Sequence, residues 1–326
     1  MPLEIVKLSK RSRNKWILRD IALEAREGRI FGICGATSSG KSTMLNVIAG
    51  IGKPNGGAIK LGGKDLALVK PKERGMTLVT NRETAGLLTI LSGGSSKESS
   101  GEKQLSAFEN AIGKAGKVLL LDDPFDQMDE HLRERCFEKI RETTHHRNRI
   151  VIFASSDFSQ IASLADDAAV LSGGYIIQTG TPQEIYETPA NVDAARLSGD
   201  NNLFEARRLS SSDSDLPEFQ TMDGNHRIFA HRPEKSRLGP INKNMTLAIR
   251  PEQVSMSMGA SFPEDNLLRA VVTNIKFRGP TSMIEFDAAG LKLETRVFKV
   301  VGLNIGVELD QAGWAAKLYI CDHRPQ

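Results

Sequence analysis

The chain has 326 residues, of which 40% are hydrophobic and 25% charged, and its formal net charge is +3. A chain of this length is too long for a single domain of ordinary size and fits two domains, and the composition is typical of a globular protein. No apolar run approaches the roughly 18 residues of a membrane span, the first residues contain too many Lys and Arg for a signal core, and three scattered cysteines form no disulfide or metal pattern. We therefore expect a cytoplasmic protein.

The first informative stretch predicts a strand over 30–34, a Gly-rich loop over 35–42 and a helix over 43–49. The loop fits G-x-x-x-x-G-K-[S/T], in which small residues let main-chain N–H groups wrap phosphates at a helix N-terminus. A Gly-rich turn with a chance lysine is the alternative, and the flanking strand and helix disfavour it. The predicted nucleotide-binding residues are Gly35, Ala36, Thr37, Ser38, Ser39, Gly40, Lys41, Ser42 and Thr43, with Lys41 on the terminal phosphates and Ser42 on Mg²⁺.

A second apolar run, 118–121, ends in Asp122, and a third spans 150–154; both are typical of strands buried on two faces. A carboxylate at such a strand end can hold Mg²⁺ through a water, so we favour a metal role for Asp122 over that of a turn former. Helical patterns near 103–113, 129–143 and 157–165 alternate with these strands, which predicts an α/β domain over residues 1–200. Over residues 201–326, short alternating runs separated by Gly and Pro predict a small all-β domain.

Several further segments carry a family resemblance. The chain resembles the ATP-binding subunits of ATP-binding cassette (ABC) importers of the sugar, polyamine and ferric-iron type in the segments 57–63 (GAIKLGG), 125–129 (FDQMD), 180–186 (GTPQEIY), 189–191 (PAN) and 248–252 (AIRPE). The resemblance implies a P-loop α/β domain with an antiparallel β-subdomain, followed by an OB-like domain called TOBE. It also implies ATP and Mg²⁺, a nucleotide contact at Asp129, and a homodimer or heterodimer with a second such subunit. The implied partners are membrane permease subunits and a solute-binding protein, with no nucleic acid, at the inner face of the cell membrane.

Several positions depart from the family pattern. Asp123 stands where the family has its catalytic glutamate, and its arm is one methylene shorter for a base that must reach the attacking water. Ser156 replaces the switch histidine, and Asn81, the remaining predicted Mg²⁺ and nucleotide ligand, replaces the Q-loop glutamine. Ser12 replaces the aromatic residue that stacks on adenine. Trp16 could substitute for it, but we favour a buried core tryptophan at that position.

The signature motif, which caps the terminal phosphate of the opposite subunit, has two candidate locations. We favour 99–102 (SSGE), with Ser99 and Gly101 as nucleotide contacts, because a good helix pattern starts at Glu102. A literal LSGG at 91–94 is the alternative, and a second copy at 171–174 is predicted to be a hairpin turn. Only residues 82–98 separate Asn81 from the favoured motif, and as one helix they would span at most about 25 Å. Most of the helical subdomain that receives the permease is therefore expected to be missing.

Two functions remain open from the sequence. In the first, the chain binds ATP, hydrolyses it slowly with Asp123, and energises import through a permease. In the second, it is a non-hydrolytic regulatory or assembly subunit that switches by nucleotide-dependent dimerisation. Phosphoryl transfer depends on positioning and charge stabilisation, so the altered residues are expected to slow hydrolysis by orders of magnitude and to leave binding to the loop.

Overall fold

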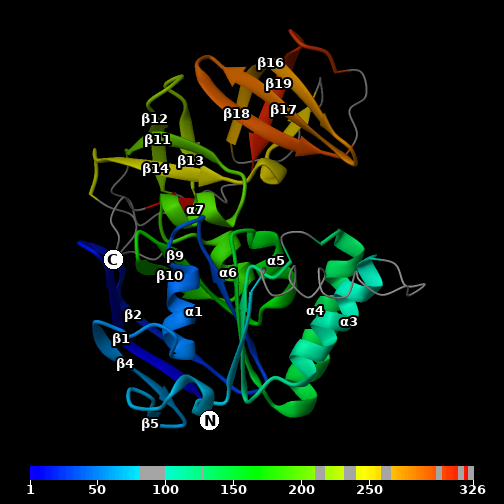
Figure 1. The fold of residues 1–326 in the computed structure, drawn as a ribbon. Coiled ribbons are helices and arrows are strands. Elements are labelled where there is room, and N and C mark those ends of the chain that lie inside the picture. The colour runs from blue at the N-terminus through cyan, green and yellow to red at the C-terminus, as the bar shows by residue number, and fades with distance from the viewer. Residues whose placement is uncertain are drawn as a thin grey trace. The chain divides into compact units, whose positions relative to one another are not determined.

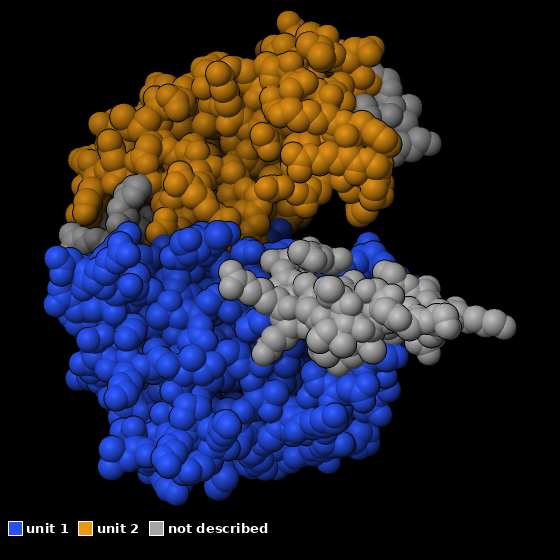
Figure 2. Space-filling model, viewed as in Figure 1, with its two compact units in different colours: residues 1–187 blue, residues 188–326 orange. Residues whose placement is uncertain are grey.

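The computed structural model describes residues 1–80, 100–125, 128–209, 217–230, 240–257, 266–298, 303–314 and 319–321. The chain divides into two compact units, residues 1–187 and 188–326, which are blue and orange in Figure 2. The sequence suggested a division after residue 200. The intervening residues include helix α7 (Val192–Ser198), whose Ala195 shares an apolar cluster with Ala248 of the second unit.

The central sheet of the first unit has six strands in the order β10–β9–β3–β8–β7–β6. Its strands are β3 (Ile30–Cys34), β6 (Met76–Thr80), β7 (Val118–Asp122), β8 (Ile150–Ser155), β9 (Asp167–Ser172) and β10 (Tyr175–Gly180). All neighbours pair in parallel except β9 and β10, which form the predicted hairpin around residues 171–174. Every residue of β3 and β8 is buried, as expected for strands covered on both faces. The predicted α/β fold is confirmed.

A second, antiparallel sheet of the first unit has the order β2–β1–β4–β5. Its strands are β1 (Leu3–Ser12), β2 (Lys15–Ala25), β4 (Gly56–Leu61) and β5 (Lys64–Asp65), and the short 3₁₀ helix η1 (Pro71–Glu73) follows. Buried side chains of this sheet, of helix α1 (Lys41–Ala49) and of the central sheet form one core, which includes Leu18, Leu45 and Leu120. Packing in this core therefore fixes the position of helix α1 without a ligand.

Arg74 adds polar contacts to this support of α1. Its guanidinium, on a residue only 9% exposed, donates hydrogen bonds to the carbonyls of Val47 and Ile48 at the end of α1 and to those of Leu66 and Val69. The bonds to Val47 and Ile48 satisfy carbonyls that the last turn of a helix leaves without intrahelical partners. Burial lowers the pKa of Arg74.

The remaining helices of the first unit are α3 (Ser100–Gly113), α4 (Glu130–Arg147), α5 (Phe158–Leu164) and α6 (Pro182–Glu187). Helices α3 and α4 lie side by side (Figure 1) and join the sheet through edge-to-face contacts among Phe108, Phe125, Phe137 and Phe153. Helix α3 starts two residues before the predicted start at Glu102. Among the described residues, no helix is long and apolar enough to cross a bilayer.

Two arginines bind the carboxyl end of α3. Arg147 donates to the carbonyl of Gly113 at 2.7 Å, and the buried Arg149 donates to the carbonyls of Ile112, at 2.7 Å, and Ala115. The sequence predicted a helix near 129–143, and α4 extends four residues further, to Arg147. Basic side chains in the last turn of a helix are favoured by its dipole.

The expectation that Trp16 is a core residue is wrong. Trp16 lies near the tip of the β1–β2 hairpin, where Arg11 is its paired neighbour, and its side chain is 38% exposed. The Arg11 guanidinium lies 5.0 Å from the centre of the indole ring, in a cation–π contact. The tip of the hairpin extends past the apolar cluster that includes Leu18, so Trp16 is not part of that cluster.

The second unit contains two five-stranded sheets with one shared core. The first sheet has the order β13–β12–β11–β14–β20, with β11 (Asn202–Arg208), β12 (Glu218–Thr221), β13 (Arg227–Phe229), β14 (Asn244–Ile249) and β20 (Tyr319–Cys321). The second has the order β15–β19–β16–β17–β18, with β15 (Ser255–Ser257), β16 (Asn266–Arg278), β17 (Thr281–Ala288), β18 (Leu291–Val297) and β19 (Glu308–Trp314), and η3 (Pro251–Gln253) joins the sheets. The predicted all-β character is seen, and the finer OB-like (TOBE) assignment stays a prediction.

Candidate functional site

The Gly-rich loop joins β3 to α1, and two of its glycines are required by the backbone. A Cβ on Gly35 would lie 2.6 Å from the carbonyl oxygen of Leu171, and Gly40 has φ 113°, which side chains rarely adopt. Ser38 also has a positive φ, of 68°, and the Ser39 N–H closes a turn on the Ala36 carbonyl at 3.0 Å. The loop therefore delivers a chain of N–H groups to the start of a helix, where an anion is favoured.

Lys41, the first residue of α1, is folded onto the loop. Its ammonium group donates to the carbonyl of Gly35 at 2.7 Å and to that of Ala36 at 3.3 Å. A carboxylate oxygen of Asp123 lies 3.7 Å from the same nitrogen, and only 5% of the lysine side chain is exposed. The positive charge is thus held in a partly desolvated position beside the phosphate loop.

Ser42 and Asp122 connect the loop with the end of β7. The Ser42 hydroxyl donates to a carboxylate oxygen of Asp122 at 3.0 Å. Burial raises the pKa of Asp122, the hydrogen bond from Ser42 lowers it, and the nearby Asp123 carboxylate raises it. The hydroxyl and carboxylate oxygens are ligands of the type that Mg²⁺ prefers.

Asp123 follows directly and turns its carboxylate towards the end of β8. Its N–H donates to the Ala154 carbonyl at 3.0 Å, and one carboxylate oxygen accepts the N–H of Ser156 at 3.0 Å. The backbone of Asp123 has φ 44°, an uncommon conformation for a residue other than glycine. Ser156 thus contributes its main chain to this contact.

These groups surround one hollow with a volume of about 380 Å³. Its lining consists of Ile17, Thr37, Ser38, Gly40, Lys41, Ser42, Thr43, Asp123 and Ser156. Eight of the sixteen predicted site residues line this hollow, from the loop, from α1 and from the positions directly after β7 and β8. Ile17 was missed, because a residue of a distant strand gives no local signal of its contact with the loop.

Other predicted site residues lie away from this hollow or outside the described residues. The Asp129 carboxylate accepts the Leu132 N–H at 2.8 Å and caps α4. Gly101 lies in the first turn of α3. Asn81 and Ser99 fall outside the described residues, so their predicted roles stay predictions.

The charges of the hollow fit a divalent cation. Two carboxylates, Asp122 and Asp123, lie near one ammonium group, that of Lys41, so the protein supplies no excess positive charge here. A bound cation would therefore stabilise anionic phosphates in the hollow. Ser42 and Asp122 would hold Mg²⁺, with waters in the remaining positions, and the ion would neutralise phosphate charge. The described residues contain no group of three or more His, Cys, Asp or Glu arranged as a protein-only metal site.

Cys34, which immediately precedes the loop, is not a nucleophile of this site. Its side chain is fully buried at the end of β3. Burial raises the pKa of the Cys34 thiol to about 12, so the reactive thiolate is scarce at neutral pH.

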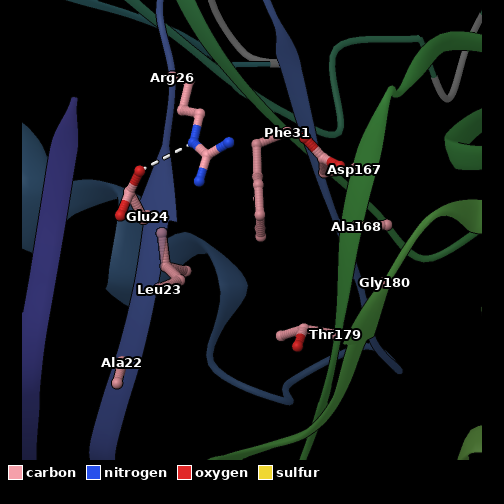
Figure 3. Close-up of a pocket in the computed structure, with 9 residues that line it drawn as sticks. All are labelled: Ala22, Leu23, Glu24, Arg26, Phe31, Asp167, Ala168, Thr179 and Gly180. Carbon is pink, nitrogen blue, oxygen red and sulfur yellow. Dashed lines mark hydrogen bonds and ion pairs between the residues drawn. The ribbon is translucent and has the colours of Figure 1, made fainter. Parts of the chain in front are cut away.

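A second hollow, of about 330 Å³, lies between β2 and the β9–β10 hairpin (Figure 3). Arg26 extends into it and bonds to Glu24 at 2.9 Å, with Phe31 nearby. Phe31 and Asp167 lie at the amino ends of β3 and β9. Ligand sites of open parallel sheets lie at the carboxyl ends of the strands, where the Gly-rich loop is, so the first hollow is the candidate phosphate site.

The strand–loop–helix unit, with its lysine and an acidic residue at the end of a neighbouring strand, defines the class of P-loop proteins. Comparisons with known proteins place the chain more closely. The family model described as "ABC transporter" matches residues 18–92. This segment, which contains the Gly-rich loop, is therefore similar to the ABC transporter family.

Relatives that resemble the chain over most of its length carry importer names. The Fe(3+) ions import ATP-binding protein FbpC of Photorhabdus laumondii is 25% identical, with 95% of each chain covered. The trehalose/maltose import ATP-binding protein MalK of Thermococcus litoralis is 25% identical over 94% of this chain and 93% of the relative. A solved ATP-binding subunit of an ABC transporter is 19% identical, with a TM-score of 0.45, and covers 57% of this chain and 92% of its own.

Proposed function

We propose that this chain is the ATP-binding subunit of an ABC import system. The observation that carries the proposal is one hollow beside the Gly-rich loop that is lined by Lys41 and Ser42, with Asp122 hydrogen-bonded to Ser42. A loop of N–H groups with one lysine and one magnesium-binding strand end suits a nucleoside triphosphate. The importer names of the relatives support transport over the regulatory alternative.

In this proposal the chain works as a dimer, either with itself or with a second ATP-binding subunit. Each composite site unites the loop of one subunit with the signature motif of the other. Membrane permease subunits and a solute-binding protein complete the system, and the chain lies on the cytoplasmic side of the membrane. The permease and the solute-binding protein select the transported substrate.

In this proposal the chain hydrolyses ATP slowly. A water molecule attacks the terminal phosphorus, the bond to the bridging oxygen breaks, and ADP and inorganic phosphate leave. Asp123 is the residue available to accept the proton of that water, but its carboxylate is engaged by Ser156 and Lys41. A base must reach its water by hydrogen bonding, so this engagement and the short side chain both reduce the rate.

Two measurements on the purified chain test the proposal. Equilibrium binding of ATP with Mg²⁺ is expected, and it should be lost or strongly weakened in Lys41→Ala. Steady-state release of phosphate from ATP is expected to exceed that of the same variant by a small margin. Absence of ATP binding would falsify the proposal. Binding with a phosphate release equal to that of Lys41→Ala would instead support the non-hydrolytic alternative.

A further inference from the structure

The contact of Asp123 with Lys41 has a consequence for nucleotide selection. Lys41 is the one ammonium among the residues that line the hollow, and its side chain is 5% exposed. One carboxylate oxygen of Asp123 lies 3.7 Å from its nitrogen. In such a partly desolvated position, charges interact much more strongly than in water.

The backbone holds the Asp123 carboxylate in this place. Its other oxygen accepts the Ser156 N–H at 3.0 Å, and its own N–H is bound to Ala154 at the end of β8. Phe125, two residues later, is buried in the aromatic cluster and anchors the chain beyond Asp123. These contacts fix the position of the Asp123 carboxylate. They also stabilise the uncommon backbone conformation of Asp123, with its positive φ of 44°.

A terminal phosphate needs the same ammonium group, because the lysine of such a loop binds the terminal phosphates. Phosphate and carboxylate are both anions, so a terminal phosphate and the Asp123 carboxylate repel each other when both lie next to Lys41. We propose that the Asp123 carboxylate is an internal counter-anion of Lys41 that competes with the terminal phosphate and lowers the preference of the site for triphosphates over diphosphates. This inference rests on the proposed function, and it assigns to Asp123 a selective role besides that of a base.

Removal of the carboxylate tests this competition. Asp123→Asn preserves the shape and removes the charge, and Asp123→Gly removes the whole side chain at a position whose positive φ suits glycine. Dissociation constants of ATP and ADP are measured by calorimetry with the full chain, in EDTA so that neither metal nor hydrolysis contributes. The ratio of the ATP constant to the ADP constant is expected to fall at least about tenfold in both variants.

Asp157→Asn is the matched control. Asp157 lies at the same end of the sheet, caps α5 through Ser159 at 2.8 Å, and loses the same charge on substitution. Its ATP-to-ADP ratio should remain that of the unmodified chain, and an equal change in all three variants would overturn the proposal, because it would reflect net charge alone.

The outcomes separate this inference from the proposed function. An unchanged ratio in both Asp123 variants, with ATP still bound, overturns the counter-anion role and leaves the proposed function intact. Loss of phosphate release in the Asp123 variants with an unchanged ratio assigns Asp123 to the base role alone and also overturns the inference. Absence of ATP and ADP binding by the unmodified chain overturns both.

Discussion

The Ser42 hydroxyl donates a hydrogen bond of 3.0 Å to the Asp122 carboxylate, although the two residues are 80 positions apart in the chain. The contact joins the first turn of α1 to the carboxyl end of β7. Both groups supply oxygens, and each is held by an element that is rigidly packed in the core. The loop and the neighbouring strand end therefore form one preorganised site.

Ser42→Ala should weaken nucleotide binding in the presence of Mg²⁺ by at least about tenfold, because a magnesium-binding oxygen and an orienting contact are lost together. The dissociation constant of ATP is measured with Mg²⁺ and again in EDTA. In EDTA the variant and the unmodified chain should bind alike. A loss of the same size under both conditions would show that the hydroxyl acts on the loop itself and not through the metal.

Gly35→Ala should destabilise the fold by about 2 kcal/mol and abolish tight ATP binding, because the added methyl group meets the Leu171 carbonyl. Gly113→Ala is the matched control, since a Cβ there meets nothing within 4 Å. Urea unfolding of both variants measures the free energy of unfolding. Equal stability of the two variants would argue against the close approach of β9 to the loop.

Arg74→Met should lower the free energy of unfolding by at least about 2 kcal/mol, because several buried carbonyls lose their donor at once. Lys72→Met, in the adjacent 3₁₀ helix and exposed, should change it by less than about 0.5 kcal/mol. Thermal and urea unfolding measure both. A small effect of Arg74→Met would mean that water replaces the guanidinium at the end of α1.

The thiols of Cys34 and Cys136 should resist alkylation in the folded protein. Both are buried, and burial raises the pKa of each to about 12, so about one thiol in 10⁴ is ionised at pH 8. Cys321→Ser removes the third cysteine from the measurement. Iodoacetamide labelling of this variant, followed by mass spectrometry, should be slow at pH 8 and fast in 6 M urea. In the folded protein the labelling rate should rise about tenfold for each pH unit above 8, in step with the ionised fraction of the thiols.

Trp16 should report on the hairpin, because it is exposed while the only other tryptophan, Trp314, is fully buried. Iodide should quench part of the fluorescence of the unmodified chain and almost none of that of Trp16→Phe. The same pair tests whether Trp16 contacts the adenine base. Quenching of the unmodified chain by ATP, absent in Trp16→Phe, would support that contact, and equal responses would exclude it.

The sequence predicted the parts of this site that are encoded locally. The loop from Gly35 to Ser42 and the apolar strand that ends in Asp122 each carry a pattern within a few residues, and the structure unites them. Contacts between distant segments carry no such pattern. Neither the packing of Ile17 on the loop nor the pairing of Lys41 with Asp123 could be read from residue types.

Errors in the predicted elements have the same origin. Trp16 was assigned to the core because tryptophan is usually buried, but its position at a hairpin tip depends on where the core ends. The last turn of α4, with its His and Arg residues, has no apolar periodicity. Its helical conformation is supported by Arg147 and Arg149 contacting α3, which are tertiary contacts.

Arg147 and Arg149 fix the carboxyl end of α3 by hydrogen bonds, and Phe108 holds the middle of the helix against Phe125. The 14 residues of α3 extend about 20 Å from the clamped turn to Ser100. The first turn of α3, at the opposite end, contains Gly101 of the favoured signature motif, so these contacts also fix the position of that residue relative to the sheet.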